Sequence, residues 1–201
     1  MDGKIMKFGE LTEEQKKAAV ELFMIGFGKF MIFSKDEELK RKLLLKIFDP
    51  ALFFCYVEGD NVLGLMGLAT NKKRPIYFDP DICKKYFGKF RGSVISRQMN
   101  AVFQSQAVKR DNELYLDTLV TGSNARRKGI GTKLLEYAFN LKEYNVMYTE
   151  VFSGNKEAIS FYKKNGFSVD KEEKWSLLIL QGAGYPIKMK KKLFSMEETA
   201  E

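Results

Sequence analysis

Two helices are predicted early in the chain, because apolar residues recur there at helical spacing. The first follows Thr12 and Gln15, which have the spacing of a capping box. The second follows Ser34, which stands three residues before Glu37 and forms a second capping box. An Asp-Pro pair at 49–50 ends it, because proline cannot continue a helix. Each helix should therefore bury one apolar face.

Short runs of apolar residues predict strands. The runs 52–57 and 62–69 are separated by a Glu-Gly-Asp-Asn turn, and this spacing predicts an antiparallel hairpin. The other runs that predict strands are 5–8, 114–121, 146–152, 175–180 and 187–193. The run 114–121 is apolar on both faces, which is typical of the buried centre of a sheet. The order of helices and strands predicts a mixed α/β sheet.

The stretch 71–112 contains no clear strand. A structureless loop of this length is improbable in a compact domain, so we expect a helical insertion there. Two later helices are predicted at 129–144 and 155–165, the second ended by Gly166 in the position that glycine takes at helix ends. The length of 201 residues favours a single domain that includes the insertion.

The amino-acid composition restricts which catalytic arrangements and metal sites the chain can form. The chain has no histidine, which excludes Ser-His-Asp and Cys-His catalytic arrangements and metal sites that use histidine. Its two cysteines, Cys55 and Cys83, are too few for a thiolate zinc site. They stand among apolar or ordinary residues, so we expect buried free thiols and no bound metal.

The net charge of +8 at pH 7 favours an anionic partner, which could be nucleic acid, a membrane surface or a polyphosphate ligand. The densest basic run, 188–192, alternates lysine with apolar residues, which is typical of an edge strand. The sequence shows neither a signal-peptide core nor an apolar stretch long enough to span a bilayer. We therefore expect a cytoplasmic protein that is not embedded in a membrane.

A predicted strand, a loop rich in glycine and cations, and a helix start follow one another before residue 132. The first turn of a helix has unpaired amide groups and the positive end of the helix dipole. Gly129 and Gly131 let a phosphate approach this backbone, and Arg126, Arg127 and Lys128 add full positive charges. The residues therefore predict a phosphate or pyrophosphate site.

The pattern R-x-x-G-x-G at 126–131 resembles the acetyl-CoA loop of the GNAT superfamily of acyl-CoA-dependent N-acyltransferases. The dinucleotide and Walker A patterns do not fit this loop. A second block, N-x-x-A-x-x-x-Y-x-x-x-G-F at 155–167, resembles the next conserved block of that superfamily. The resemblance covers about residues 113–170. Ser123 and Arg127 depart from it, because the family commonly has proline and glycine there.

The resemblance implies a mostly antiparallel central sheet whose middle strands splay apart and are flanked by helices. The pantetheine arm of acetyl-CoA would lie in this gap and pair with the backbone of Leu119, Val120 and Thr121. Asn155 would hold the arm or order the site, and Tyr162 would protonate the departing thiolate. The pyrophosphate would bind at Arg126, Arg127, Lys128, Gly129, Ile130, Gly131 and Thr132.

The acceptor amine must lose a proton before it attacks the thioester. Strand alternation places Asp117 on the same face as Tyr115 and Leu119. A carboxylate in a buried strand must be paired or have a raised pKa, so Asp117 is a candidate base. The alternatives are that Asp117 only accepts a hydrogen bond from a loop, and that Tyr162 only packs in its helix.

The leading hypothesis is an N-acetyltransferase that transfers an acetyl group from acetyl-CoA to an amine of a small molecule, peptide or protein. The alternative is a non-catalytic acyl-CoA sensor or interaction module on the same fold, since a fold does not dictate an activity. Nucleic-acid binding ranks last, because only the net charge supports it. The sequence does not identify the acceptor, the acyl length or the oligomeric state, and it leaves a homodimer open.

Overall fold

The computed structural model describes residues 3–172 and 184–193. Its strands are β1 Lys4–Lys7, β2 Phe53–Glu58, β3 Asn61–Ala69, β4 Glu113–Thr121, β5 Val146–Phe152, β6 Ser168–Glu172 and β7 Pro186–Lys192. Its α-helices are α1 Glu13–Phe27, α2 Glu37–Ile47, α3 Pro80–Phe87, α4 Lys89–Phe103, α5 Ile130–Phe139 and α6 Lys156–Lys164. Short 3₁₀ helices are η1 Phe8–Glu10, η2 Gly28–Phe30 and η3 Ser123–Ala125.

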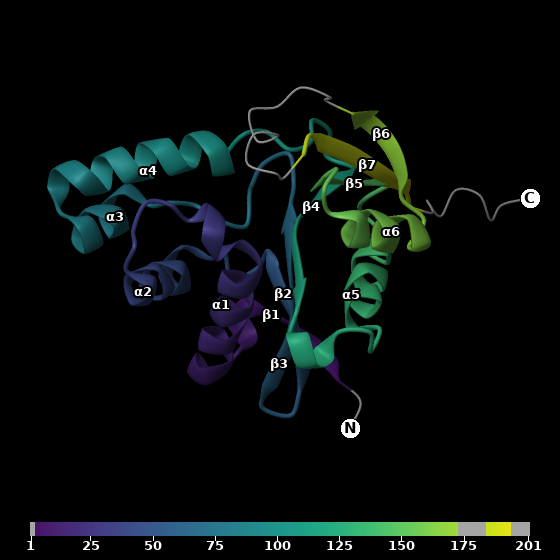
Figure 1. Cartoon of the computed structure of the whole chain (residues 1–201), viewed down its shortest axis with the longest axis horizontal. Helices are drawn as coiled ribbons and strands as arrows, with labels where there is room; N and C mark the ends of the chain where they lie inside the picture. Colours follow the sequence, from purple (N-terminus) through teal and green to yellow (C-terminus); the bar gives the residue numbers. More distant parts are fainter. Residues whose placement is uncertain (1–2, 173–183, 194–201) are drawn as a thin grey trace, which may run out of the picture.

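The strands form one sheet with the order β1-β2-β3-β4-β5-β7-β6 (Figure 1). Within residues 3–172 and 184–193, only the β4–β5 pair is parallel, and the other neighbouring strands are antiparallel. Helices α1 to α4 lie on one side of the sheet, and α5 and α6 lie on the other (Figure 1). The predicted α/β class, with a mostly antiparallel sheet flanked by helices, is confirmed.

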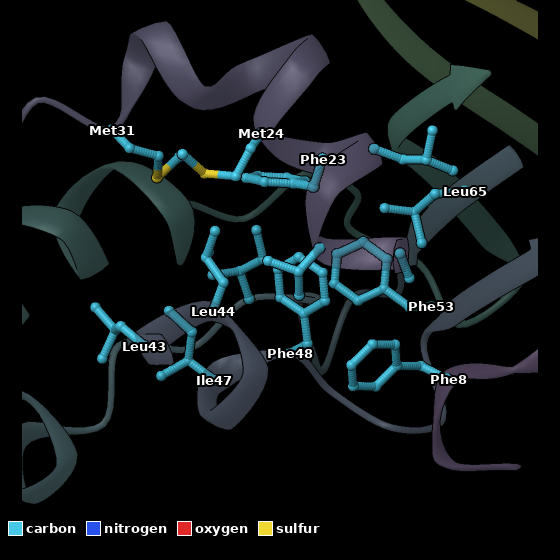
Figure 2. Close-up of a cluster of buried hydrophobic side chains, with 14 of the residues drawn as sticks. Phe8, Phe23, Met24, Met31, Leu43, Leu44, Ile47, Phe48, Phe53 and Leu65 are labelled. Carbon is cyan, nitrogen blue, oxygen red and sulfur yellow. The ribbon is translucent and has the colours of Figure 1, made fainter. Parts of the chain in front are cut away.

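Two hydrophobic cores form, one on each face of the sheet, because strand side chains alternate between the faces. In β2, Phe53 and Cys55 point toward the core under α1 and α2, while Phe54 and Tyr56 join the core under α5 and α6. Figure 2 shows the first core, in which Phe48 stacks on Phe53 with ring centroids 4.1 Å apart. Burial of this aromatic surface fixes α1 and α2 against the sheet.

Helix α1 begins as the sequence predicts, whereas α2 begins differently. Thr12 and Gln15 form the expected reciprocal capping box at α1. At α2 the capping residue is Asp36, whose carboxylate accepts from the amide of Leu39 at 2.9 Å. The Ser34 hydroxyl instead accepts from the amide of Asp36. The predicted second capping box is therefore wrong, because a carboxylate nearer the first turn does the capping.

The C-terminal half departs from the prediction in three places. Helix α5 ends at Phe139 rather than continuing to 144. Strand β6 was not predicted; all its residues are exposed, so it lacks an apolar alternation. Strand β7 lies between β5 and β6, so the expectation of an edge strand at 188–192 is wrong. The predicted strand 175–180 lies outside the described residues.

The register between β3 and β4 shifts by one residue beside the centre of the sheet. Leu68 pairs with Leu116 and Gly67 pairs with Thr118, so Asp117 is an extra residue on β4 without a partner on β3. Such a β-bulge interrupts the alternation of side chains. Leu119 consequently packs into the core under α5 and α6. The predicted shared face of Asp117 and Leu119 is therefore wrong.

Two helices, α3 and α4, occupy most of the stretch 71–112. Helix α3 begins after Asp79, whose carboxylate accepts from two first-turn amides at 2.9 Å. Cys83 and Ile95 bury one side of the pair in the first core, together with Met99. Among the helices in the described ranges, none has the length and apolarity needed to cross a bilayer.

Candidate active site

Strands β4 and β5 separate partway along their length. Their pairing runs from Glu113 with Val146 to Leu116 with Thr149 and then ends, although both strands continue. Beyond that point β4 still pairs with β3 on its other edge, through to Thr121. Main-chain groups of residues 118–121 on the β5 side therefore lack a strand partner within the described structure. Such an edge can accept an extended ligand as an added strand.

A glycine- and cation-rich loop lies at the open end of β4, where α5 begins (Figure 1). Gly129 precedes α5 with φ of 77°, and a Cβ atom added there would meet nothing within 4 Å. In the described residues no side chain caps the first turn of α5. The amides of this turn, together with the exposed Arg126 and Lys128, thus form a site suited to an anionic group.

The backbone of this loop has a left-handed residue, Arg127, and a close helix contact at Gly131. Arg127 has a φ of 63°, a left-handed conformation in which L-residues other than glycine are strained. This explains why glycine suits the position and why Arg127 is an unusual choice. A Cβ atom added to Gly131 would lie 3.1 Å from the ring of Phe161. Gly131 therefore allows α5 and α6 to approach each other closely next to the loop.

Replacing Arg127 with glycine should raise the free energy of unfolding by about 0.5–1 kcal/mol, because relief of the left-handed strain exceeds the added entropy of the unfolded chain. Denaturant unfolding measures this change. Lys128→Gly is the matched control: Arg127 alone among the described non-glycine residues has a positive φ, so glycine at 128 brings no such relief and should destabilise. Equal effects of the two variants would contradict the strain at 127.

Tyr162 lies on α6 with its phenol beside the point where β4 and β5 separate. The Thr149 hydroxyl donates to the carbonyl of Leu116 at 3.1 Å and lies beside the phenol of Tyr162. Tyr162 is only 9% exposed. Burial raises the pKa of Tyr162, and the neighbouring Thr149 hydroxyl only partly opposes that rise. The phenol therefore stays protonated at neutral pH and can donate a proton.

Asn155 is the capping residue of the helix that carries Tyr162. Its side-chain oxygen accepts from the amide of Ala158 at 3.1 Å. The observed contact orders α6, which is one of the two roles predicted for Asn155. Gly166 ends this helix with a φ of 86°, as predicted, and Phe167 returns to pack on the Tyr162 ring at 5.5 Å.

Asp117 points toward the loop after β3, where Arg74 binds it. Arg74 donates from Nε and Nη2 to the two carboxylate oxygens of Asp117, at 3.2 and 2.8 Å. Burial raises the pKa of Asp117, and the positive charge of Arg74 opposes that rise. The structure therefore brings together the 119–121 edge, the 126–132 loop and Tyr162, but it holds Asp117 on Arg74. The role of Asp117 as a base stays a prediction.

Four residues near the separation of β4 and β5 had no assigned role in the sequence. Tyr115 pairs across the strands with Tyr148, and Glu150 follows Thr149 on β5. Burial and the negative charges of Glu150 and Asp117 raise the pKa of Tyr115. The residues newly placed at the site are Arg74, Tyr115, Thr149 and Glu150. For Tyr115, Thr149 and Glu150 the only signal in the sequence is their position on predicted neighbouring strands, whereas Arg74 lies on the loop after β3 and has no such signal.

This architecture defines an α/β fold of the acetyltransferase class: a parted sheet, a glycine-rich helix start and a buried phenol between them. The sequence profile of the acetyltransferase (GNAT) family matches residues 19–167. The chain belongs to this family.

Known proteins agree with the assignment. N-alpha-acetyltransferase 50 of zebrafish, Danio rerio, is 39% identical over 77 residues, which are 36% of this chain and 44% of that protein. The chain thus spans less than half of this relative. An N-acetyltransferase from Staphylococcus aureus Mu50 shares the fold at a TM-score of 0.62 and 15% identity, covering 93% of this chain and 99% of its own. The Ard1 structure from Thermoplasma volcanium gives 0.58 at 15% identity, covering 97% and 100%.

Proposed function

We propose that the protein is an N-acetyltransferase that transfers the acetyl group of acetyl-CoA directly to an amine. One observation carries the proposal: the unpaired edge of β4 runs from the first turn of α5 to the buried phenol of Tyr162. Membership of the GNAT family supports acetyl transfer as the reaction class. The name of the zebrafish relative favours the α-amine of a peptide or protein as the first acceptor to test.

The nucleotide end of acetyl-CoA would bind at the start of α5. Arg126, Arg127 and Lys128 would neutralise the phosphates, and the amides up to Thr132 would donate to them. The open space beside Gly129 supports this assignment, because a side chain there would meet the ligand first. The pantetheine arm would then pair with the backbone of 119–121 and extend toward Thr149.

In the reaction, the amine nitrogen forms a bond to the thioester carbonyl carbon and the carbon–sulfur bond breaks. A main-chain N–H near Val120 would polarise the carbonyl oxygen. Tyr162 would give its proton to the departing thiolate, and its raised pKa supports this role because the phenol is protonated beforehand. No covalent intermediate on the protein is needed.

The proton lost by the amine needs a base. We favour Glu150 as that base, because its exposed carboxylate lies on β5 directly beyond Thr149, where pairing with β4 ends, and its negative charge reaches Tyr115. Glu150→Gln should remove the acidic limb of the pH profile of kcat, since this limb reports protonation of the base. Asp117→Asn should keep that limb. The opposite pattern would return the role of base to Asp117.

Titration with acetyl-CoA, followed by an assay for released CoA with a panel of peptides and small amines, tests the function. A thiol reagent should detect released CoA without reacting with the native protein. The reason is that Cys55 and Cys83 are buried, and burial raises their pKa values to about 12 and about 11. We expect saturable binding and acceptor-dependent release of CoA. Binding without release from any acceptor would instead support a non-catalytic acyl-CoA sensor, and no binding at millimolar acetyl-CoA would reject both.

A further inference from the structure

We propose that Arg74 is a positioning residue for catalysis: by holding the β-bulge at Asp117, it keeps the 118–121 edge of β4 in the conformation that receives the pantetheine arm. The inference rests on the proposed function for the identity of the ligand. It concerns a residue outside the two sequence motifs, on the loop that connects β3 with α3.

Arg74 joins three parts of the molecule through one guanidinium group. Nε and Nη2 donate to Asp117 on β4. Nη1 donates to the carbonyl of Ser105, just after α4, at 2.7 Å. The guanidinium carbon also lies 5.4 Å from the centre of the Tyr115 ring. The stretch 71–112 is thereby tied to the strand that borders the proposed pantetheine gap.

The residue that Arg74 holds is the one that the sheet leaves unpaired. Asp117 has no partner on β3 because of the register shift, and β5 pairing ends at Leu116. A bulge residue makes no regular ladder contact, so a side-chain contact such as that from Arg74 can fix its position. The bulge sets which of the next residues face each side of the sheet, and a slip of one residue would exchange Leu119 with Val120. The Arg74–Asp117 pair therefore controls the edge offered to the ligand.

Because the Arg74–Asp117 pair is buried, water cannot easily solvate either charge if the other is removed. The side chains of Arg74 and Asp117 are only 12% and 14% exposed. Removing one partner leaves an uncompensated charge in a poorly solvated place, and the strand must move to hydrate it. The exposed pair of Arg41 and Glu21, which joins α2 to α1, lacks this constraint at 32% and 48% exposure. It supplies a control pair that joins two helices instead of holding a residue of the sheet.

The experiment compares Arg74→Gln with Arg41→Gln in the full chain. Calorimetric titration uses two probes: acetyl-CoA, and phosphoadenosine diphosphate, the nucleotide part of coenzyme A without its pantetheine arm. In Arg74→Gln we expect acetyl-CoA affinity to fall about tenfold or more, since breaking a buried pair is costly, while the nucleotide part binds as in the wild type. Amide hydrogen exchange of the 113–121 segment should also become faster. Arg41→Gln should change none of these.

Two more variants separate positioning from stability. Arg74→Gln with Asp117→Asn removes both charges and should regain thermal stability, yet it should keep the weakened preference for acetyl-CoA over the nucleotide part. Arg74→Lys should restore that preference only partly, because lysine lacks the two-pronged geometry. Wild-type affinity for acetyl-CoA in the double variant would overturn the proposal, as would unchanged exchange in Arg74→Gln. The exchange measurement needs no ligand, so failure of the proposed function shows separately, as absent acetyl-CoA binding by the wild type.

Discussion

Arg126→Glu combined with Gly129→Glu should lower acetyl-CoA affinity by about a hundredfold or more, since each charge-assisted contact removed is worth roughly 1.5–3 kcal/mol. Two carboxylates would replace a cation and an open space at the first turn of α5. The glutamate at 129 would enter the volume in which a Cβ atom meets no protein atom within 4 Å. It would also compete with the phosphate for the same main-chain amides.

The control must reproduce both the charge change and the backbone strain. Gly59, in the turn between β2 and β3, has a φ of 57° and equally open surroundings. Lys142 is an exposed cation in the connection between α5 and β5. Gly59→Glu with Lys142→Glu therefore matches the test variant and should retain wild-type affinity in the same titration. Equal losses in the two variants would mean that net charge, rather than this loop, governs binding.

The conformation of the loop before α5 was predictable because its signals are local. A helix start, two glycines and three cations within a few residues define both the conformation and the charge of the loop, whatever packs around it. The hairpin of β2 and β3 was likewise set by a turn between two apolar runs. Tyr162 could be placed on a helix with Asn155 at its start, because capping depends on neighbours along the chain.

Features that depend on contacts between distant residues could not be predicted. The bulge at Asp117 arises from its register against β3, and nothing in β4 alone displays it. Arg74 reaches Asp117 from a loop 43 residues earlier, so their pairing follows from how the β3–α3 connection folds back. Strand β6 has only exposed residues and is recruited by pairing with β7, which periodicity cannot reveal. Tertiary pairing decided each of these cases.

The candidate site contains both kinds of feature: those set by residues close together in the sequence and those set by contacts between distant residues. The loop proposed to bind the nucleotide is one continuous segment, whereas the groups proposed to react come from separate elements. Thr149 on β5 donates to the carbonyl of Leu116 on β4 and lies beside the phenol of Tyr162 on α6. This contact fixes the proposed acid at the place where the two strands part. The catalytic prediction therefore depends on one tyrosine whose neighbours are all set by the fold.

Tyr162→Phe should lower kcat about a hundredfold while leaving acetyl-CoA affinity within about twofold, because loss of a general acid affects only the transition state. The departing thiolate would then have to be protonated by solvent. Phenylalanine keeps the ring contacts with Phe161 and Phe167, each at 5.5 Å, so the packing of α6 should survive. Steady-state rates of CoA release and acetyl-CoA titration measure the two quantities separately.

Tyr137→Phe provides the matched control, because Tyr137 is another helical tyrosine, on α5, whose ring packs 5.2 Å from that of Phe54. It should leave both kcat and affinity unchanged. A thioester whose leaving group has a lower pKa should partly rescue Tyr162→Phe, since a weaker base needs less help from an acid. Such rescue is not expected if Tyr162 only supports the packing of α6. Equal loss of affinity and kcat, or an unaffected rate, would therefore rule out proton donation and reduce Tyr162 to a structural residue.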